Sequence, residues 1–297
     1  MHEPMAELIV ETSELRKSYD GVEALRGLDL QLPAGSICGF LGKNGAGKTT
    51  TIKILLGLAH PTSGVARVFG SAIDASARQR IGFVSEEKDL YGYMTVDDMI
   101  RFTAAFFPRW RADLQQRYVR KFDLPLMRKV KELSRGTRTK LALLLAFCRG
   151  AELLIFDEPT SGLDPAMAND VLQAIIGHVA NEAMTVFFSS HQIAEVDQIA
   201  DRVVIIDRGR SIVAGTLDDL REKFCRIEIV FGGEAPAVTF RAPGVLRTKR
   251  MGRVISVFSN AGADDIAAEA SALGAVSVDV MPVTLKEIFL ESVSEEE

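Results

Sequence analysis

The chain has 297 residues, of which 47% are hydrophobic and 25% are charged, and its formal net charge is −5. This composition is typical of a globular protein with a sizeable core, and the negative charge gives no reason to expect a nucleic-acid partner. The three scattered cysteines lack the spacing of a metal site and favour buried thiols in a reducing compartment.

A membrane-spanning segment is not predicted. The longest apolar run, at 141–148, is far shorter than the roughly 18 to 20 residues that span a bilayer. The stretch MHEPMAELIVE at the start is acidic and lacks the apolar core of a signal peptide. We therefore expect a cytoplasmic chain that can dock on a membrane protein but is not one itself.

The first 150 residues predict strands followed by helices. Apolar and β-branched runs broken by glycine and proline are typical of strands, and helical spacing begins after residue 50. TVDD at 95–98 has the form of a helix start within a largely helical region at about 88–150. Strands are expected at 8–11, 15–19, 24–32, 36–42 and 80–84, and a helix is expected at 51–58.

The following stretch predicts a buried parallel sheet. Three nearly unbroken apolar runs, at 153–156, 185–190 and 202–209, are typical of strands that helices cover on both faces. Helices are expected between these strands, at about 165–180 and 192–200. This alternation of strand and helix predicts an α/β fold.

A second, smaller domain is predicted from the change of pattern near residue 222. We expect a first domain at 1–221 and a small α+β accessory domain at 222–297. The strands of the second domain are expected at 226–231, 237–240, 254–259 and 276–281, and its helices at 263–273 and 284–293.

GKNGAGKT at 42–49 has the form G-x-x-x-x-G-K-[ST] and stands between a predicted strand and a predicted helix. Its glycines let backbone N–H groups approach phosphate oxygens, and the helix N-terminus adds a partial positive charge. Lys48 can reach the β- and γ-phosphates, and Thr49 can offer its hydroxyl to Mg²⁺. The alternative is a glycine-rich turn with a chance lysine. The expected nucleotide-binding residues here are Gly42, Lys43, Asn44, Gly45, Ala46, Gly47, Lys48, Thr49 and Thr50.

LLIFDEPT at 153–160 supplies acidic side chains to the same site. Asp157 ends a predicted strand at the sheet edge where α/β proteins bind ligands, and it suits the Mg²⁺ shell. Glu158 can orient or deprotonate a water that attacks the γ-phosphate, although such a pair is often only a strand end. His191 ends another predicted strand at this edge and can either contact the γ-phosphate or be structural.

The motifs GKNGAGKTT, LSRGT (133–137), LLIFDEPTSGLDP and SSH (189–191), in this order, resemble the nucleotide-binding subunit of an ATP-binding cassette (ABC) transporter. The resemblance covers about residues 8–220. It implies a P-loop NTPase fold with a RecA-like core, an N-terminal antiparallel β-subdomain and a helical subdomain. It also implies an ATPase that uses ATP and Mg²⁺ and works as a head-to-tail dimer with a second cassette, either another copy or a sister subunit.

LSRGT stands where the family has its signature LSGGQ, which completes the ATP site of the other cassette. Ser134 and Gly136 match the signature, and a helix at 138–149 would aim its N-terminus at the partner's γ-phosphate. Ser134 can be a simple N-cap at the same time. Arg135 replaces a glycine and either brings a cation near the partner's phosphates or faces solvent. Thr137 replaces the signature glutamine, and we assign no effect to it.

Three further positions carry over from the family one by one. Tyr19 matches the aromatic residue that stacks on adenine, although it can also be a plain strand-end tyrosine. Asp164 matches the loop that links the two ATP sites across the dimer. His191 matches the switch histidine, which favours the functional interpretation of this residue.

Glu86 departs from the family, which often has glutamine where its loop touches Mg²⁺ and the attacking water and senses the membrane partner. A glutamate only accepts hydrogen bonds and adds a negative charge beside the triphosphate, yet it can ligate Mg²⁺. We therefore expect altered hydrolysis or altered coupling rather than an inactive site.

The branch of the family is inferred from the spacing of the motifs and from the number of cassettes in the chain. About 90 residues separate Gly42 from Leu133, too few for the coiled coil of related DNA-repair ATPases, and a single cassette argues against the translation-factor branch. A separate polytopic membrane subunit is then implied. LYGYMTVDDMIRF and VMPVTLKEIFLE resemble cassettes that serve ABC-2-type exporters, which places the chain at the inner face of the cell membrane as a peripheral subunit.

Two other functions and one surface remain open. FFPRW at 106–110 is either an exposed aromatic patch for the membrane subunit or part of the core. The chain can also be a regulatory ATP-binding module with weak turnover, or a soluble ATPase without a role in transport.

Overall fold

The computed structural model describes residues 7–182 and 184–293 and consists of two compact units. Unit 1 is Met1–Ala214 and unit 2 is Gly215–Glu297, so the division falls at residue 215 rather than at 222 as predicted. Within the described residues, no helix is both long and apolar enough to cross a membrane.

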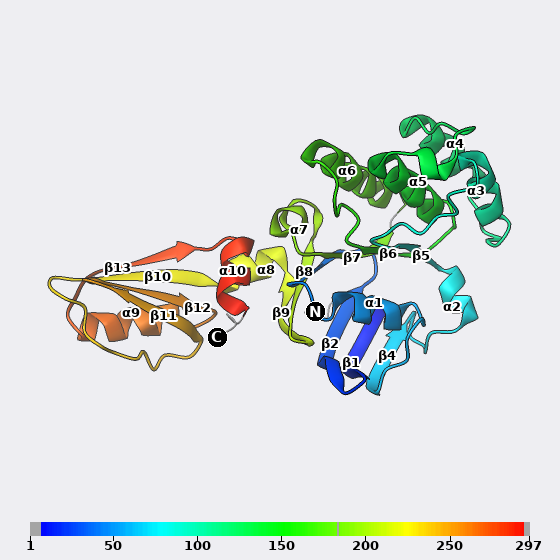
Figure 1. Ribbon diagram of the computed structural model, residues 1–297. Coiled ribbons are helices and arrows are strands. Elements are labelled where there is room, and N and C mark those ends of the chain that lie inside the picture. Colours follow the sequence, from blue (N-terminus) through cyan, green and yellow to red (C-terminus); the bar gives the residue numbers. More distant parts are fainter. Residues whose placement is uncertain (1–6, 183, 294–297) are drawn as a thin grey trace, which may run out of the picture. The chain divides into compact units, whose positions relative to one another are not determined.

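The centre of unit 1 is a six-stranded sheet in the order β5-β6-β7-β3-β8-β9 (Figure 1). The four pairings from β5 to β8 are parallel, and most of their residues are buried, which explains their apolar sequences. The strands are β3 (Ile37–Leu41), β5 (Ile81–Val84), β6 (Leu153–Asp157), β7 (Thr185–Ser190), β8 (Arg202–Asp207) and β9 (Arg210–Thr216).

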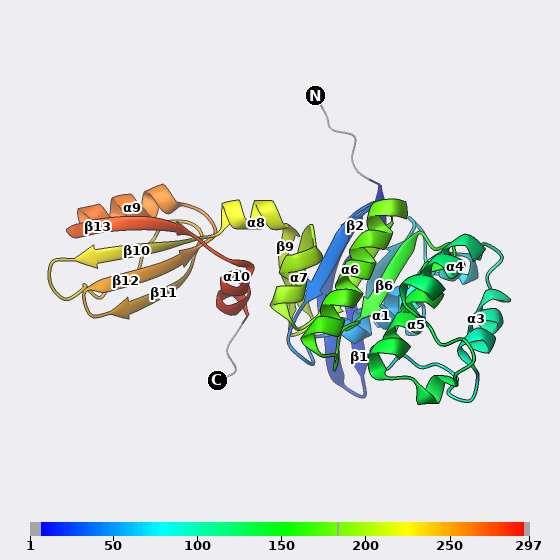
Figure 2. The same ribbon diagram turned by 90° about the horizontal axis from the view of Figure 1, so that it is seen from above.

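Helices cover both faces of this sheet (Figures 1 and 2). One face carries α5 (Arg135–Phe147), α6 (Pro165–Glu182) and α7 (Ile193–Ile199), and the other carries α1 (Lys48–Leu55). The shorter helices α3 (Val96–Ala104) and α4 (Ala112–Lys121) pack on α5 and form, with it, the region predicted to be helical. The remaining helices of unit 1 are α2 (Ala75–Gln79) and a 3₁₀ turn at Val130–Glu132.

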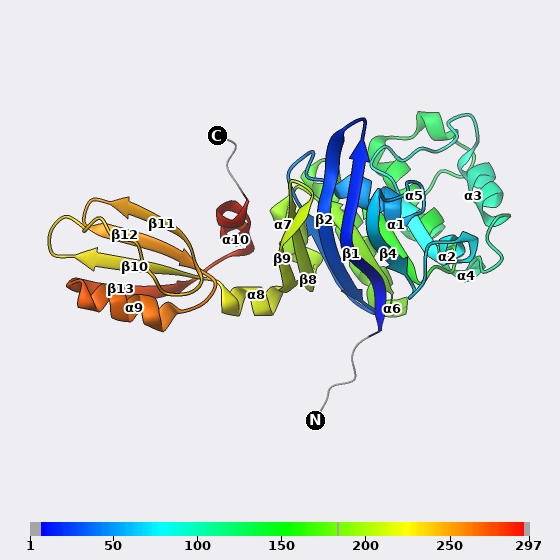
Figure 3. The same ribbon diagram turned by 90° about the horizontal axis from the view of Figure 1, so that it is seen from below.

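A second, antiparallel sheet of unit 1 has the order β2-β1-β4 and lies over α1 (Figure 3). Its strands are β1 (Leu8–Tyr19), β2 (Val22–Pro33) and β4 (Ser63–Val68). Ile52 and Leu55 of α1 share one core with Leu28 of this sheet and Phe187 of the parallel sheet. The helix that follows the P-loop is therefore held between two sheets, which gives its N-terminus a fixed position.

Unit 2 is an antiparallel sheet in the order β11-β12-β10-β13, with α9 packed on one face. Alternate residues of the central strands, such as Ile227, Ile229 and Val257, form its core with Ile266 of α9. The elements are α8 (Leu217–Lys223), β10 (Cys225–Phe231), β11 (Val245–Met251), β12 (Val254–Ser259), α9 (Ala263–Ala272), β13 (Ala275–Pro282) and α10 (Leu285–Ser292).

Several sequence-based predictions differ from these elements. Residues 237–240 are not a strand; they are irregular, and Phe240 is buried in the core of unit 2. Helix α5 begins at Arg135 instead of 138, because the Ser134 hydroxyl accepts a hydrogen bond from the Thr137 N–H and caps the helix there. β4, α2, β9, α8 and β11 were not predicted; β11, VLRTKRM, is a charged edge strand without an apolar pattern.

Candidate nucleotide site

The P-loop joins β3 to α1 in a conformation that requires glycine. Gly47, the N-cap of α1, has φ 113°, and a Cβ at this position would lie 2.8 Å from the Ala24 carbonyl oxygen. Lys48 follows and is buried, with its ammonium donating a 2.8 Å hydrogen bond to the Gly42 carbonyl. The loop therefore presents backbone N–H groups and one buried cation at the carboxyl edge of the sheet.

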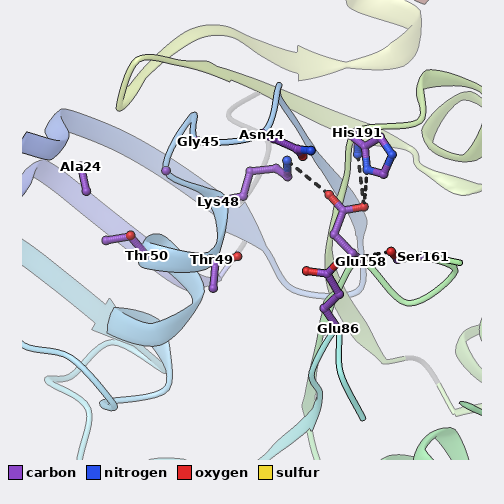
Figure 4. Close-up of a pocket in the computed structure, with 11 residues that line it drawn as sticks. Ala24, Asn44, Gly45, Lys48, Thr49, Thr50, Glu86, Glu158, Ser161 and His191 are labelled. Atoms are coloured by element: carbon purple, nitrogen blue, oxygen red, sulfur yellow. Dashed lines mark hydrogen bonds and ion pairs between the residues drawn. The ribbon is translucent and has the colours of Figure 1, made fainter. Parts of the chain in front are cut away.

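A cavity of about 390 Å³ opens at this edge, and Figure 4 shows the side chains around it. It joins six of the predicted P-loop residues to residues from four other segments of the chain. The lining residues are Ala24, Asn44, Gly45, Gly47, Lys48, Thr49, Thr50, Glu86, Glu158, Ser161 and His191. Ala24 and Ser161 were not predicted as site residues, although Ser161 lies within the motif LLIFDEPTSGLDP.

Glu158 is the centre of the polar contacts in this cavity (Figure 4). One carboxylate oxygen lies 3.2 Å from the Lys48 ammonium, and the other lies 2.8 Å from Nδ1 of His191. Glu158 is only 6% exposed and has φ 47°, a left-handed conformation that is rare for residues other than glycine. Such strained backbone is concentrated at functional sites, and here it turns the carboxylate toward the P-loop.

Ser189 connects the ends of two neighbouring strands and was not predicted to belong to the site. Asp157 of β6 and Ser189 of β7 are paired in register, and the Ser189 hydroxyl donates a 2.6 Å hydrogen bond to the Asp157 carboxylate. The same hydroxyl accepts a 3.0 Å hydrogen bond from the Glu158 N–H. Ser189 therefore fixes both acidic residues. It stands in the motif SSH, but its role depends on a strand pairing that no local motif reveals.

Burial raises the pKa of Asp157 above its ordinary value, although hydrogen bonds from Ser189 and Thr49 oppose this shift. The carboxylates of Glu158 and Glu86 add to the increase. The site is therefore crowded with negative charge, and a cation there would stabilise the ionised form of Asp157.

The oxygen donors of this site suit a Mg²⁺ ion that is shared with nucleotide phosphates better than a metal ion that protein side chains bind alone. Among residues 7–182 and 184–293, no three His, Cys, Asp or Glu side chains are grouped so that they could hold a metal. Mg²⁺ is usually bound by one or two carboxylates together with phosphate oxygens. Thr49 and Asp157 offer such a set, and Glu86 reaches the same cavity, where it accepts a 3.1 Å hydrogen bond from Ser161.

Comparison with known proteins identifies the family. The profile of the ABC transporter family matches residues 25–161, and a profile described as an AAA domain, putative AbiEii toxin, Type IV TA system, matches residues 128–197. Nod factor export ATP-binding protein I of Cupriavidus metallidurans is 30% identical over 95% of this chain and 96% of its own. The chain belongs to the ATP-binding proteins of ABC transporters. The family, the fold class and the ATPase class predicted from the sequence are thereby confirmed.

Two further relatives of this cassette agree. The bacitracin transport ATP-binding protein BcrA of Bacillus licheniformis is 33% identical, and the match covers 72% of each chain. A bacterial ABC transporter cassette solved as a dimer superposes with a TM-score of 0.64 over 70% of this chain and 98% of its own. Its sequence identity is 19%, so this last likeness concerns the fold.

The signature motif of the cassette lies apart from the nucleotide cavity. Ser134 caps α5, and Gly136 is packed so closely that a Cβ would lie 2.7 Å from Met167. Arg135 donates a 3.2 Å hydrogen bond to the Gly162 carbonyl of its own chain and remains exposed. Arg135 was predicted either to approach the partner's phosphates or to face solvent. The structure supports neither role by itself, because the exposed guanidinium is also hydrogen-bonded to the loop that follows Glu158.

The remaining predicted residues do not line this cavity. The carbonyl of Lys43 accepts hydrogen bonds from Lys48 and from the N–H of Ala46. Tyr19 is 42% exposed beneath the ammonium of Lys17, 4.7 Å from its ring centre. Asp164 accepts a 3.0 Å hydrogen bond from the Met167 N–H at the start of α6. The adenine-stacking role of Tyr19 and the cross-dimer role of Asp164 stay predictions.

Proposed function

We propose that this cassette binds and hydrolyses ATP with Mg²⁺ and transmits the resulting movement to a separate membrane subunit of an ABC-2-type exporter. The observation that carries the proposal is the contact of Glu158 with both Lys48 and His191 in the P-loop cavity. A carboxylate that can orient or deprotonate water, next to the P-loop lysine, suits phosphoryl transfer to water, and His191 adds a polar group beside it.

Each side chain has a role that follows from its position. The P-loop amides and Lys48 hold the phosphates, and Glu158 accepts the proton of the attacking water or orients it. His191, partly exposed and bonded to Glu158, completes the polar side of the cavity. Bound Mg²⁺ would neutralise charge on the phosphates, held by Thr49 and Asp157 with Glu86 as a further candidate.

A second cassette would complete the site. Helix α5 begins with Arg135 and Gly136 and has no acidic residue in its first turn, so its N-terminus favours an anion. Ser134, Arg135 and Gly136 would approach the ATP of the partner, and Asp164 would lie between the two sites. The dimeric cassette that shares this fold supports such an assembly.

Export is supported by the relatives and by one surface of the helical region. The names of two relatives describe bacitracin transport and Nod factor export. Tyr93, Tyr91, Phe102 and Phe106 form a chain of exposed rings with successive centroid distances of 5.8, 5.5 and 5.0 Å. Solvent-exposed aromatic clusters of this kind mark interaction surfaces. We assign this one to the membrane subunit, at the inner face of the cell membrane.

The segment FFPRW contributes to this surface only in part. Phe106 is 60% exposed, whereas Phe107 lies under the guanidinium of Arg149, 3.8 Å from its ring centre. Phe107 and Arg149 line a neighbouring cavity of about 310 Å³ that also contains Leu90 and Met99. A groove of mixed apolar and charged residues beside exposed rings fits a helix end of a membrane subunit.

ATP hydrolysis by the purified chain tests the proposal, with Glu158→Gln measured in parallel. We expect wild type to turn over and Glu158→Gln to lose about a hundredfold or more in rate. The variant should form an ATP-dependent dimer in size-exclusion chromatography, because it binds ATP without hydrolysing it. Co-purification with a polytopic membrane protein checks the transport role.

Two outcomes would favour the other functions. ATP binding without turnover, in the presence of the membrane subunit as well, would identify a regulatory module. Turnover that is unaffected by any membrane protein, together with failure to co-purify one, would identify a soluble ATPase.

A further inference from the structure

Lys88 is a buried cation whose ammonium makes no hydrogen bond among the described residues. Its side chain is 5% exposed, and its ammonium has no hydrogen-bond acceptor within the described parts of the chain. Its backbone has φ 51°, and its N–H closes a turn on the Ser85 carbonyl at 3.3 Å. Burying an unpaired ammonium destabilises a fold, and a left-handed lysine adds strain. A stability argument therefore does not account for this residue.

The surroundings of Lys88 connect it to the nucleotide site. It lines a cavity of about 480 Å³ with Glu86, Glu87, Arg135, Arg138 and Ser161. Glu86 and Ser161 also line the nucleotide cavity, so they form a wall common to both. Burial lowers the pKa of Lys88, and the Glu86 carboxylate is the strongest of the nearby charges that oppose this shift.

The other cations near this wall are already engaged. The Lys48 ammonium is paired with Glu158 at 3.2 Å. Arg135 donates to the Gly162 carbonyl, and Arg138 donates to the Val130 carbonyl at 3.5 Å. Of these four cations, Lys88 is the one whose charged group makes no hydrogen bond among the residues that the structure describes.

Glu86 creates the need for such a cation. Together with Asp157 and Glu158 it brings a third carboxylate to a site that would receive a triphosphate, where glutamine would add no charge. We propose that Lys88 is a positioning residue that compensates Glu86: its positive charge offsets the negative charge of the Glu86 carboxylate and holds it in place when nucleotide binds. The inference rests on the proposed function, and it explains why a glutamate is tolerated at this position.

Four proteins test the pair: wild type, Lys88→Met, Glu86→Gln and the double variant. The measurements are the Kd for MgATP by calorimetry, KM and kcat for hydrolysis, and the Tm without nucleotide. In the wild-type background we expect Lys88→Met to raise Kd and KM about tenfold through the lost charge, with a smaller change in kcat. In the Glu86→Gln background the same substitution should change Kd and KM less than about twofold, since the carboxylate that Lys88 compensates is then absent.

The Tm separates this role from a structural one. Because Lys88→Met removes a buried, unpaired charge, we expect it to raise the Tm or leave it unchanged while it weakens MgATP binding. An equal loss of MgATP affinity in both backgrounds, or a fall in Tm that accompanies the loss, would overturn the pairing with Glu86. If wild type itself failed to bind MgATP, the proposed function would fail instead, so the two failures can be told apart.

Discussion

Each of the two units of this cassette contains a cluster of charged side chains, but the clusters differ in burial and in how completely the charges are paired. In unit 2, Glu291 lies within 3.6 Å of Arg226, 3.1 Å of Arg247 and 3.0 Å of Lys249, and the three cations are partly exposed. In unit 1, Lys48 and Glu158 are each buried and face a cavity, and Lys88 is buried without a partner.

The carboxylates reflect this difference. Burial opposes the ionisation of Glu291, but the hydrogen bonds and charges of Lys249 and Arg247 outweigh it, so its pKa is lowered. The pKa of Asp157, by contrast, is raised by burial and by its acidic neighbours. In a charge cluster that stabilises the fold, each charged group is paired with an opposite charge of the protein. In a cluster that binds a ligand, some charges are neutralised only when the ligand is present. The following predictions test this contrast.

The largest effect is expected for Ser189→Ala. The substitution removes the hydroxyl that holds Asp157 at 2.6 Å and the Glu158 N–H at 3.0 Å, so both acidic residues lose their position. We expect kcat/KM for ATP to fall by roughly two to three orders of magnitude, comparable to the loss of a preorganised polar contact in other active sites. Steady-state hydrolysis assays measure it.

A buried serine of unit 2 provides the matched control. Ser259 donates a 2.8 Å hydrogen bond to the Gly244 carbonyl and is fully buried. Ser259→Ala should lower stability by about 1–3 kcal/mol, as unsatisfied buried polar groups do, and leave hydrolysis unchanged. Equal losses of activity in the two variants would mean that Ser189 acts through folding alone.

The sequence predicts those site residues that lie together in short motifs better than those that packing brings together from distant segments. Lys48, Asp157 and Glu158 lie in short motifs whose flanking strands have strong apolar patterns, and the structure brings Lys48 and Glu158 to one cavity. Ser189 and Lys88 act through a strand register and through burial, which arise only when distant segments pack. Motifs in the sequence therefore identify the groups proposed to bind a ligand more readily than the groups proposed to position them.

The fold follows the same division. The apolar strands β6, β7 and β8 were predicted because they are buried on both faces. The charged edge strand β11 was missed because its pairing with β12, rather than its composition, makes it a strand. The start of α5 was placed three residues late, although Ser134, which caps the helix, had been recognised as a possible N-cap.

The next prediction compares two histidines of unit 1, His178 and His191, of which His191 lines the nucleotide cavity and His178 does not. His178 is fully buried, stacks on Phe147 at 4.0 Å and has its pKa lowered to about 4 by burial. The unfolded chain, with a histidine pKa near 6.5, therefore binds the proton first. Stability is complete above about pH 6.5 and falls by about 3 kcal/mol as the pH drops to about 4.

Urea unfolding between pH 7 and pH 4.5 measures this loss. Carboxylates also titrate in part of this range, so the relevant quantity is the difference between wild type and His178→Phe, which keeps a ring against Phe147. The pH dependence of that difference should follow a single proton. A difference that does not vary with pH would show that His178 binds its proton as readily in the folded protein as in the unfolded chain, and that burial does not lower its pKa.

A smaller effect is expected for Glu291→Gln in unit 2. Without the carboxylate, Arg226, Arg247 and Lys249 repel one another, although their partial exposure screens the repulsion. We expect a loss of about 1–2 kcal/mol in the unfolding of unit 2 and no change in the Kd for MgATP. If Glu291→Gln instead raised the unfolding free energy, it would no longer contrast with Lys88→Met, which is expected to leave stability unchanged or to raise it.

The smallest effect is expected where the same kind of pair lies on the surface. Arg67 of β4 and Glu11 of β1 approach to 3.4 Å, and their side chains are 49% and 38% exposed. Water already solvates both groups, and ordering two long side chains opposes the attraction, so Arg67→Gln should change the unfolding free energy by less than about 0.5 kcal/mol. The difference in Tm between wild type and Arg67→Gln should be the same at low salt and at 1 M salt, because the attraction that salt would screen is already small. If this exposed pair proved worth as much as the Glu291 cluster, pairing rather than burial would set the energy of a charge in this cassette, and the unpaired Lys88 would need another explanation.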